Sequence, residues 1–261
     1  MRPASSRGSV VVTAMSLMLA LLALLGCGCG RSDPDLTVFA ASSLSGHLET
    51  AMGSHTTMGS AASGSEGGVI VEYQFAGSQA LLEQIRQGAQ PDIVILAEPS
   101  IDAPRYIPEP AGNAGLRPRV LVRNQLALVT PPDNPGDVQS LDDLARPELR
   151  IAICAPTVPC GASTAAMTSQ LHIDVAPDTT ESSVRSVLAK VIAQEVDAAV
   201  VYATDAQFAG DQVKLIDTVS TASGYVAWQL NDENSTVDAW FAQLITHGVD
   251  GLVDLGFPAF P

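Results

Sequence analysis

The sequence predicts an α/β fold with two lobes, each built on a mostly parallel sheet flanked by helices. Short apolar runs of strand length, such as residues 36–41 and 92–96, alternate with segments whose apolar residues recur at helical spacing, such as 78–88. Alternation of this kind is typical of parallel sheets covered on both faces. The strands form two groups, one on each side of about residue 122, which favours one sheet in each lobe.

The first lobe is expected to contain three strands and two helices. Residues 36–41 and 69–75 have strand patterns, and the continuous apolar run at 92–96 is typical of a buried parallel strand. Helices are expected at 44–52 and 78–88, the second ending at a glycine. Residues 53–68 lie between the first helix and the second strand. They are rich in Gly, Ser and Thr and are interpreted as a flexible loop.

The second lobe repeats the alternation, and the chain then continues past it. Its expected strands are 121–130, 150–155 and 197–202. One helix is expected to begin at Ser140 and another at Ser163, and two more are expected at 183–194 and 204–209. The tail contains a strand near 225–230 and helices around 237–247 and 248–255. These last helices have no sheet of their own, so we expect them to pack on the first lobe. The predicted lobes are therefore 35–122 plus 222–261, and 123–221.

The N-terminus has the pattern of an export signal. Residues 1–26 begin with Arg2 and Arg7, continue through an apolar run that is short for a membrane span, and end in small residues. The sequence Leu-Leu-Gly-Cys ending at Cys27 resembles a bacterial lipobox, which predicts lipidation of Cys27 and a tether at 27–34. The alternatives are modification of Cys29 and an uncleaved membrane anchor. Each of them places the rest of the chain outside the cytoplasm.

The charge of the chain excludes a nucleic-acid partner but allows an anionic ligand. Removal of residues 1–26 leaves 11 basic residues against 28 acidic ones, so the formal charge changes from −15 to −17. Nucleic acids require a basic face, which this composition does not provide. A closed site, however, can hold an anion with neutral dipoles, and net charge then affects mainly the association rate.

Cys154 and Cys160 are the two cysteines that remain beyond the lipobox region. In an oxidising compartment a lone pair of cysteines most simply forms a disulfide. Two free thiols and a metal-binding pair are the alternatives, although no further ligands lie near them in the sequence. The four histidines are scattered without metal-ligand spacing. Arg185 could add charge near the site, but it is interpreted as a solvated helix residue.

Two segments, 38–44 and 75–81, each lead from a strand pattern through small residues and a serine into a helix pattern. Such a turn places a hydroxyl and unpaired N–H groups at a helix N-terminus, where anions bind. A single segment of this kind usually only caps a helix. Because ligands of open α/β sheets bind beyond the carboxyl ends of the strands, the pair suggests one oxyanion held between them.

The order of short motifs resembles that of the molybdate-binding proteins of ABC importers, a branch of the type II periplasmic-binding-protein fold. The resemblance covers about residues 35–257 and is carried by six motifs: Thr-Val-Phe-Ala-Ala-Ser-Ser-Leu at 37–44, Phe-Ala-Gly-Ser at 75–78, Pro-Asp-Ile-Val-Ile-Leu-Ala-Glu at 91–98, Ala-Pro-Thr-Val-Pro-Cys-Gly at 155–161, Ser-Ser-Val-Arg at 182–185 and Val-Val-Tyr-Ala-Thr-Asp-Ala at 200–206. It implies a ligand in the cleft between two lobes, held by neutral donors alone.

The resemblance also implies which residues bind the oxyanion. Ser43 and Ser78 would each give a hydroxyl and a backbone N–H, Cys160 and Val184 a backbone N–H, and Tyr202 its phenolic O–H. Ser42 stands where the family often has alanine, so Ser42 could replace or supplement Ser43. A disulfide at Cys160 would leave this role intact because the role belongs to the backbone.

The implied function is capture of molybdate, and of tungstate, for the membrane permease of an ABC importer. The protein would be a monomer, lipid-anchored at the outer face of the cell membrane, with no cofactor and with molybdenum present only in the bound oxyanion. Another tetrahedral oxyanion such as sulfate is the alternative ligand, and phosphate is disfavoured because its proton would need a carboxylate acceptor. A secreted serine hydrolase is a third possibility, but the sequence has no Gly-x-Ser-x-Gly elbow, and we therefore expect no enzyme activity.

Overall fold

The structure, a computed structural model, describes residues 33–53, 56–58, 69–97 and 118–260. The predicted signal peptide, the lipidation candidates Cys27 and Cys29 and most of the predicted tether lie outside these residues. Within the described ranges, no helix has the length and apolar character needed to cross a membrane.

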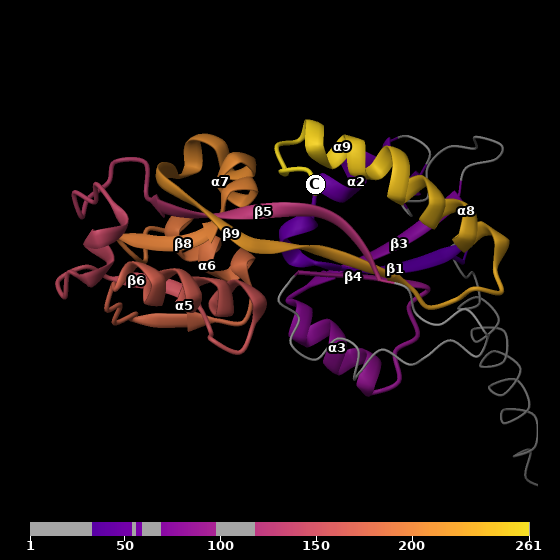
Figure 1. Ribbon diagram of the computed structural model, residues 1–261, viewed down its shortest axis with the longest axis horizontal. Helices are drawn as coiled ribbons and strands as arrows, with labels where there is room; N and C mark the ends of the chain where they lie inside the picture. Colours follow the sequence, from indigo (N-terminus) through magenta and orange to yellow (C-terminus); the bar gives the residue numbers. More distant parts are fainter. Residues whose placement is uncertain (1–32, 54–55, 59–68, 98–117, 261) are drawn as a thin grey trace, which may run out of the picture. The chain divides into compact units, whose positions relative to one another are not determined.

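The described strands form one sheet of nine strands in the order β2-β3-β1-β4-β9-β5-β8-β6-β7 (Figure 1). Their bounds are β1 (Leu36–Ala41), β2 (Thr56–Met58), β3 (Val69–Ala76), β4 (Ile93–Ala97), β5 (Arg119–Thr130), β6 (Ile151–Cys154), β7 (Thr179–Glu181), β8 (Ala198–Tyr202) and β9 (Lys214–Gln229). The pairs among β1 to β4 and among β6 to β8 are parallel, as predicted. The expectation of two separate sheets is wrong, because β5 and β9 belong to both halves and join them.

Strands β5 and β9 run antiparallel to each other and cross between the halves (Figure 1). The first residues of β5 pair with the end of β9 near Ala227, and its last residues pair with the start of β9 near Lys214. Between these two stretches the register shifts, once between Val120 and Arg123 and again between Arg123 and Gln125. Such irregularities bend a strand locally and leave residues without ladder partners. A bend point therefore lies in the connection between the two halves of the sheet.

Helices cover the sheet at both halves. Their bounds are α2 (His47–Met52), α3 (Ser78–Arg86), α5 (Pro159–Leu171), α6 (Val184–Ile192), α7 (Ala203–Ala209), α8 (Ser235–Gln243) and α9 (Val249–Asp254), with 3-10 turns η1 (Ser42–Leu44), η3 (Leu141–Ala145) and η4 (Gly210–Gln212) and a π turn η5 (Leu244–Gly248). One core of buried side chains is formed by β6, β8, α5, α6, α7 and the C-terminal part of β5. Separate cores are formed around β1, β3 and β4.

The separate cores agree with the two-lobed fold class. Val237, Trp240 and Leu252 of the C-terminal helices pack in the core that contains β1 and β4. We use first lobe for the part around β1, β3 and β4 and second lobe for the part around β6 and β8. The residue boundaries given above remain a prediction.

Several elements differ from the prediction in their limits. The helix expected at 44–52 is divided into η1 and α2, because Gly46 adopts φ +81°, a left-handed conformation that favours glycine. The loop expected at 53–68 contains the short strand β2, which pairs with β3, and most of its other residues lie outside the described ranges. The strand expected near 225–230 begins much earlier, at Lys214.

Candidate functional site

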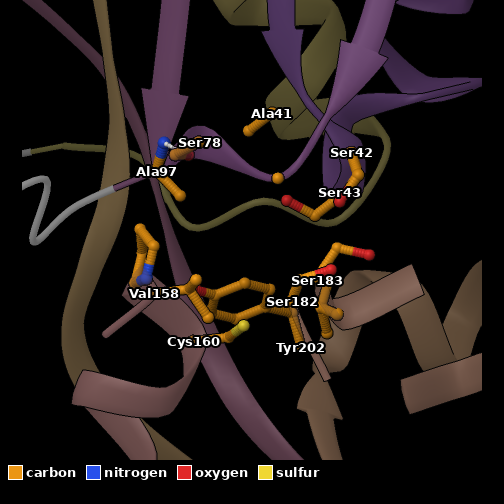
Figure 2. Close-up of a pocket in the computed structure, with 13 residues that line it drawn as sticks. Ala41, Ser42, Ser43, Ser78, Ala97, Val158, Cys160, Ser182, Ser183 and Tyr202 are labelled. Atoms are coloured by element: carbon orange, nitrogen blue, oxygen red, sulfur yellow. Dashed lines mark hydrogen bonds between the residues drawn. The ribbon is translucent and has the colours of Figure 1, made fainter. Parts of the chain in front are cut away.

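A pocket lies where the carboxyl ends of the parallel strands of both lobes meet (Figure 2). It holds about 250 Å³ of empty space, part of it open to solvent. First-lobe residues line one side, namely Ala41, Ser42, Ser43, Gly77, Ser78 and Ala97. Second-lobe residues line the other, namely Val158, Pro159, Cys160, Ser182, Ser183, Val184 and Tyr202. The structure thus brings together all six residues that the resemblance selected, including the additional candidate Ser42.

The hydroxyl groups of Ser43 and Ser78 are both buried and both already accept a hydrogen bond. Ser43 Oγ accepts from the Tyr225 hydroxyl at 2.8 Å, and Ser78 Oγ accepts from the Ala97 backbone N–H at 3.0 Å. Since a serine hydroxyl carries one hydrogen of its own, each remains able to donate it. Both first-lobe serines can therefore act as donors in the pocket, and the hydrogen bond that each Oγ accepts holds that oxygen in place.

The three helix starts at the pocket supply backbone donors. Ser78 is the first residue of α3, Cys160 lies in the first turn of α5, and Val184 is the first residue of α6. The first N–H groups of a helix have no carbonyl partner within it, and the helix dipole places partial positive charge there. The helix expected from Ser163 begins instead at Pro159, a residue suited to the first helical position, so Cys160 is part of the helix.

Cys154 and Cys160 form a disulfide. The bond connects the end of β6 to the first turn of α5, both of which belong to the second-lobe core. It therefore fixes the segment that carries the Cys160 N–H. The alternatives of free thiols or a metal-binding pair are excluded by this bond.

The phenol of Tyr202 ends strand β8 and is almost completely buried. Its hydroxyl makes no hydrogen bond to the described residues. Burial and the neighbouring Asp205 carboxylate raise the pKa of Tyr202, and the nearby hydroxyls of Ser223 and Ser163 only partly offset this. Tyr202 therefore stays protonated at neutral pH and offers a donor to the pocket, on the side opposite Ser43 and Ser78 (Figure 2).

Tyr225 and Asn124 support the site from behind, and sequence analysis did not select them. The Asn124 side-chain amide donates to the Tyr225 hydroxyl at 3.0 Å and lies 2.9 Å from the Thr204 hydroxyl, also as donor. Tyr225 in turn donates to Ser43. This chain of hydrogen bonds orients the Ser43 hydroxyl toward the pocket. The sequence offered only a strand pattern around Tyr225, and no motif indicates a buried polar contact there.

Arg185 is not the solvated residue that we predicted. Its side chain is mostly covered, with 24% exposure, and lies near the buried Asp205. It also donates hydrogen bonds to the backbone carbonyls of Ser42 and Ser45 in the first lobe. These contacts place its charge against the segment behind the pocket, and Arg185 is not among the residues that line it.

Close backbone contact between the lobes requires a glycine beside the pocket. A Cβ atom on Gly77 would lie 2.5 Å from the Ser182 carbonyl oxygen, which is nearer than real Cβ contacts allow. Gly77 is the N-cap of α3, and Ser182 precedes the start of α6. The two helix N-termini can therefore approach the same space only because residue 77 has no side chain.

The pocket is lined by neutral groups. The lining residues of the described chain carry hydroxyls, backbone amides and small apolar groups, and none carries a charged side chain. Hydrogen-bond donors and helix dipoles can hold an oxyanion without a cation. Within the part of the chain that the structure describes, no three His, Cys, Asp or Glu residues cluster as metal ligands would.

Comparison with known proteins shows the family to which this chain is related. Residues 36–241 match the family of bacterial extracellular solute-binding proteins. The molybdate-binding protein ModA of Mycobacterium bovis is 32% identical over 202 residues, which cover 73% of this chain and 74% of that protein. Proteins of this family are found outside the cytoplasm, as the export signal predicts.

Two solved structures are similar in fold at low sequence identity. The periplasmic molybdate-binding protein of Azotobacter vinelandii superposes with a TM-score of 0.65 at 15% identity, covering 87% of this chain and 99% of that one. The sulfate-binding protein SubI of Mycobacterium tuberculosis gives 0.63 at 15% identity and covers 87% of each chain. The fold class predicted from the sequence is confirmed, and the chain belongs to the family of bacterial extracellular solute-binding proteins.

Proposed function

We propose that this protein captures molybdate, and also tungstate, outside the cytoplasm and delivers it to the permease of an ABC importer. The observation that carries the proposal is the pocket itself. Serine hydroxyls and helix N-termini from both lobes converge there with the unpaired Tyr202 hydroxyl, and no lining side chain is charged. The similarity to a protein named molybdate-binding, at 32% identity over most of both chains, supports this choice of ligand.

The donors assigned to the oxyanion are Ser43, Ser78, Cys160, Val184 and Tyr202, with Ser42 as an additional candidate. Each can donate a hydrogen bond, and no lining residue of the described chain carries a carboxylate that could accept a hydrogen bond from a protonated ligand oxygen. The site therefore favours a fully deprotonated dianion. Choice among tetrahedral dianions would depend on their size.

Sulfate is the second candidate ligand, because the fold is also that of a sulfate-binding protein. Titration calorimetry of the purified protein with molybdate, tungstate, sulfate and phosphate separates the candidates. We expect molybdate and tungstate to bind at one site per chain, and sulfate and phosphate to bind much more weakly. Preference for sulfate would transfer the function to sulfate uptake, and binding of none of the four would overturn the proposal.

A hydrolase function is tested on the same samples. The hydroxyl of Ser43 is hydrogen-bonded to a tyrosine and that of Ser78 to a backbone amide, whereas a catalytic serine needs a general base within reach. We therefore propose that the protein is not an enzyme. Turnover of a chromogenic ester that is lost in Ser43→Ala or Ser78→Ala would contradict this.

Lipid anchoring through Cys27 is proposed from the lipobox pattern. In cells supplied with labelled fatty acid, the wild-type protein and Cys29→Ala are expected to incorporate label, and Cys27→Ala is not. Label that persists in Cys27→Ala but is lost in Cys29→Ala would move the anchor to Cys29. We also propose that the mature protein is a monomer, which its mass in solution tests.

A further inference from the structure

Arg185 makes contacts in both lobes at once. It is the second residue of α6 in the second lobe, directly after the pocket residue Val184. Its Nη2 donates to the Ser45 carbonyl at 2.7 Å, and its Nε donates to the Ser42 carbonyl at 3.2 Å. Ser42 is the first residue of the first-lobe turn η1, which carries Ser43, and Ser45 is the C-cap of that turn. One side chain therefore connects the donor segment of the first lobe to a donor helix of the second.

The charge of Arg185 is balanced within the second lobe. The carboxylate of Asp205 in α7 is fully buried and lies 3.2 Å from Arg185 Nε. The guanidinium carbon also lies 4.6 Å from the centre of the Phe208 ring, a cation–π distance. A planar guanidinium can serve a carboxylate, two carbonyls and an aromatic face simultaneously, which an ammonium cannot. The environment is thus matched to arginine in particular.

A cluster that we call the seam makes further contacts between the lobes; it consists of Arg185, Phe208, Gly46 and His47. The Phe208 ring lies against Gly46, where a Cβ atom would come within 2.7 Å of the ring. It also lies 5.3 Å, centre to centre, from the buried His47 ring. Arg185 is the charged member of this seam, which lies behind η1 and outside the residues that line the pocket.

We propose that Arg185 is a positioning residue for oxyanion binding, which holds the Ser42–Ser43 segment and the start of α6 in the arrangement where their donors face one ligand. The inference rests on the proposed function but goes beyond it, because Arg185 does not touch the ligand. Its bonds to Ser42 and Ser45 exist only while the lobes are together. They therefore shift the population toward the closed arrangement and slow the release of a bound ion.

The test compares dissociation and association rates of molybdate, measured by stopped-flow, in Arg185→Gln, Arg185→Lys and Lys190→Gln. We expect Arg185→Gln to raise the dissociation rate about tenfold or more while the association rate changes little. Arg185→Lys should recover only part of the loss, because it cannot reach both carbonyls and the carboxylate together. Among the described residues, Lys190 on the same helix pairs with Glu181 and Glu195 in its own lobe, and it serves as the matched control.

A double variant separates positioning from a merely structural effect. Arg185→Gln leaves the buried Asp205 without its cation, and this alone could disturb the second lobe. Adding Asp205→Asn removes the uncompensated charge. If the dissociation rate then returns to the wild-type value, or if it is unchanged in Arg185→Gln, the inference is overturned. A rate that stays high in the double variant supports it.

Failure of the proposed function can be told apart from failure of this inference. If the wild-type protein binds none of the four oxyanions, the proposed function is wrong and Arg185 is tested without ligand by small-angle X-ray scattering. Arg185→Gln is then expected to have a larger radius of gyration than the wild type and Lys190→Gln. Equal radii in the three proteins would overturn the role of Arg185.

Discussion

Ser43 and Ser78 show how single residues fit the proposed chemistry. Each hydroxyl accepts one hydrogen bond from within its own lobe and keeps its hydrogen for the pocket. A hydrogen bond to a charged group contributes about 1.5–3 kcal/mol. Ser43→Ala and Ser78→Ala are therefore each expected to weaken molybdate binding by that amount, measured by calorimetry. The exposed Ser169→Ala is the control, and wild-type affinity in both site variants would refute the assignment.

Asp205 predicts a pH dependence of stability. Burial raises the pKa of this carboxyl from 3.8 to about 7, and the Arg185 charge opposes the shift only in part. Between pH 4 and 7 the folded protein thus binds more protons at Asp205 than the unfolded chain does. The resulting contribution to the free energy of unfolding is full below about pH 4 and is lost as the pH rises through about 7.

Comparison with Asp205→Asn isolates this contribution by urea unfolding at several pH values. The stability of the wild type relative to the variant should fall from pH 4 to pH 7 and be constant above. Burial and Arg185 lower the pKa of His47, which has the opposite effect on stability, but His47 is present in both proteins. A difference that does not vary with pH would show that Asp205 is ionised throughout.

At the residue scale, the sequence was more informative about donors than about their support. The pocket is lined by all five predicted donors, namely Ser43, Ser78, Cys160, Val184 and Tyr202. They could be predicted because short motifs at strand ends are local signals in the sequence. Tyr225, which donates a hydrogen bond to Ser43, lies 182 positions from it in the sequence. Asn124, which donates to Tyr225, lies 101 positions from Tyr225. Contacts between residues so far apart in the sequence form only in the folded sheet. For the same reason, the sequence does not reveal that Arg185 contacts Ser42 and Ser45.

The start of α5 illustrates what an element contributes. The Cys154–Cys160 disulfide ties the first turn of this helix to β6. Because the proposed donor is the Cys160 backbone N–H, freeing this turn should weaken molybdate binding several-fold, as ordering a donor then costs part of the binding energy. Calorimetry with reduced protein, and with Cys154→Ser/Cys160→Ser, measures the effect. Equal affinity in oxidised and reduced protein would contradict it.

Prediction of the elements succeeded where a segment has a strong local apolar pattern. Strand β4 and helix α6 were expected close to their observed limits, since β4 is a continuous apolar run that is buried throughout and the buried residues of α6 recur at helical spacing. Strand β9 was recognised only near its end, because residues 214–224 are mainly small or polar and pair with β5 far along the chain. The single sheet was missed for the same reason, since β5 and β9 join the lobes through pairing that no local pattern reveals.

At the scale of the whole molecule, β5 and β9 connect the lobes through a stretch of shifted register. Hinge closure around a ligand uses a few such connecting residues. Molybdate should therefore reduce the radius of gyration in solution scattering, because the donors of both lobes can reach one ion only when the lobes are together. A scattering profile that is identical with and without a saturating ligand would argue against closure.

The proposed function requires above all that an oxyanion is held between the two lobes by neutral donors. The most direct measurement is a crystal structure with molybdate, with the metal located from its anomalous scattering. We expect one molybdenum peak per chain, with oxygens within hydrogen-bond distance of donors on Ser43, Ser78, Cys160, Val184 and Tyr202. A peak elsewhere, or an oxyanion held by a charged side chain, would contradict the proposed function.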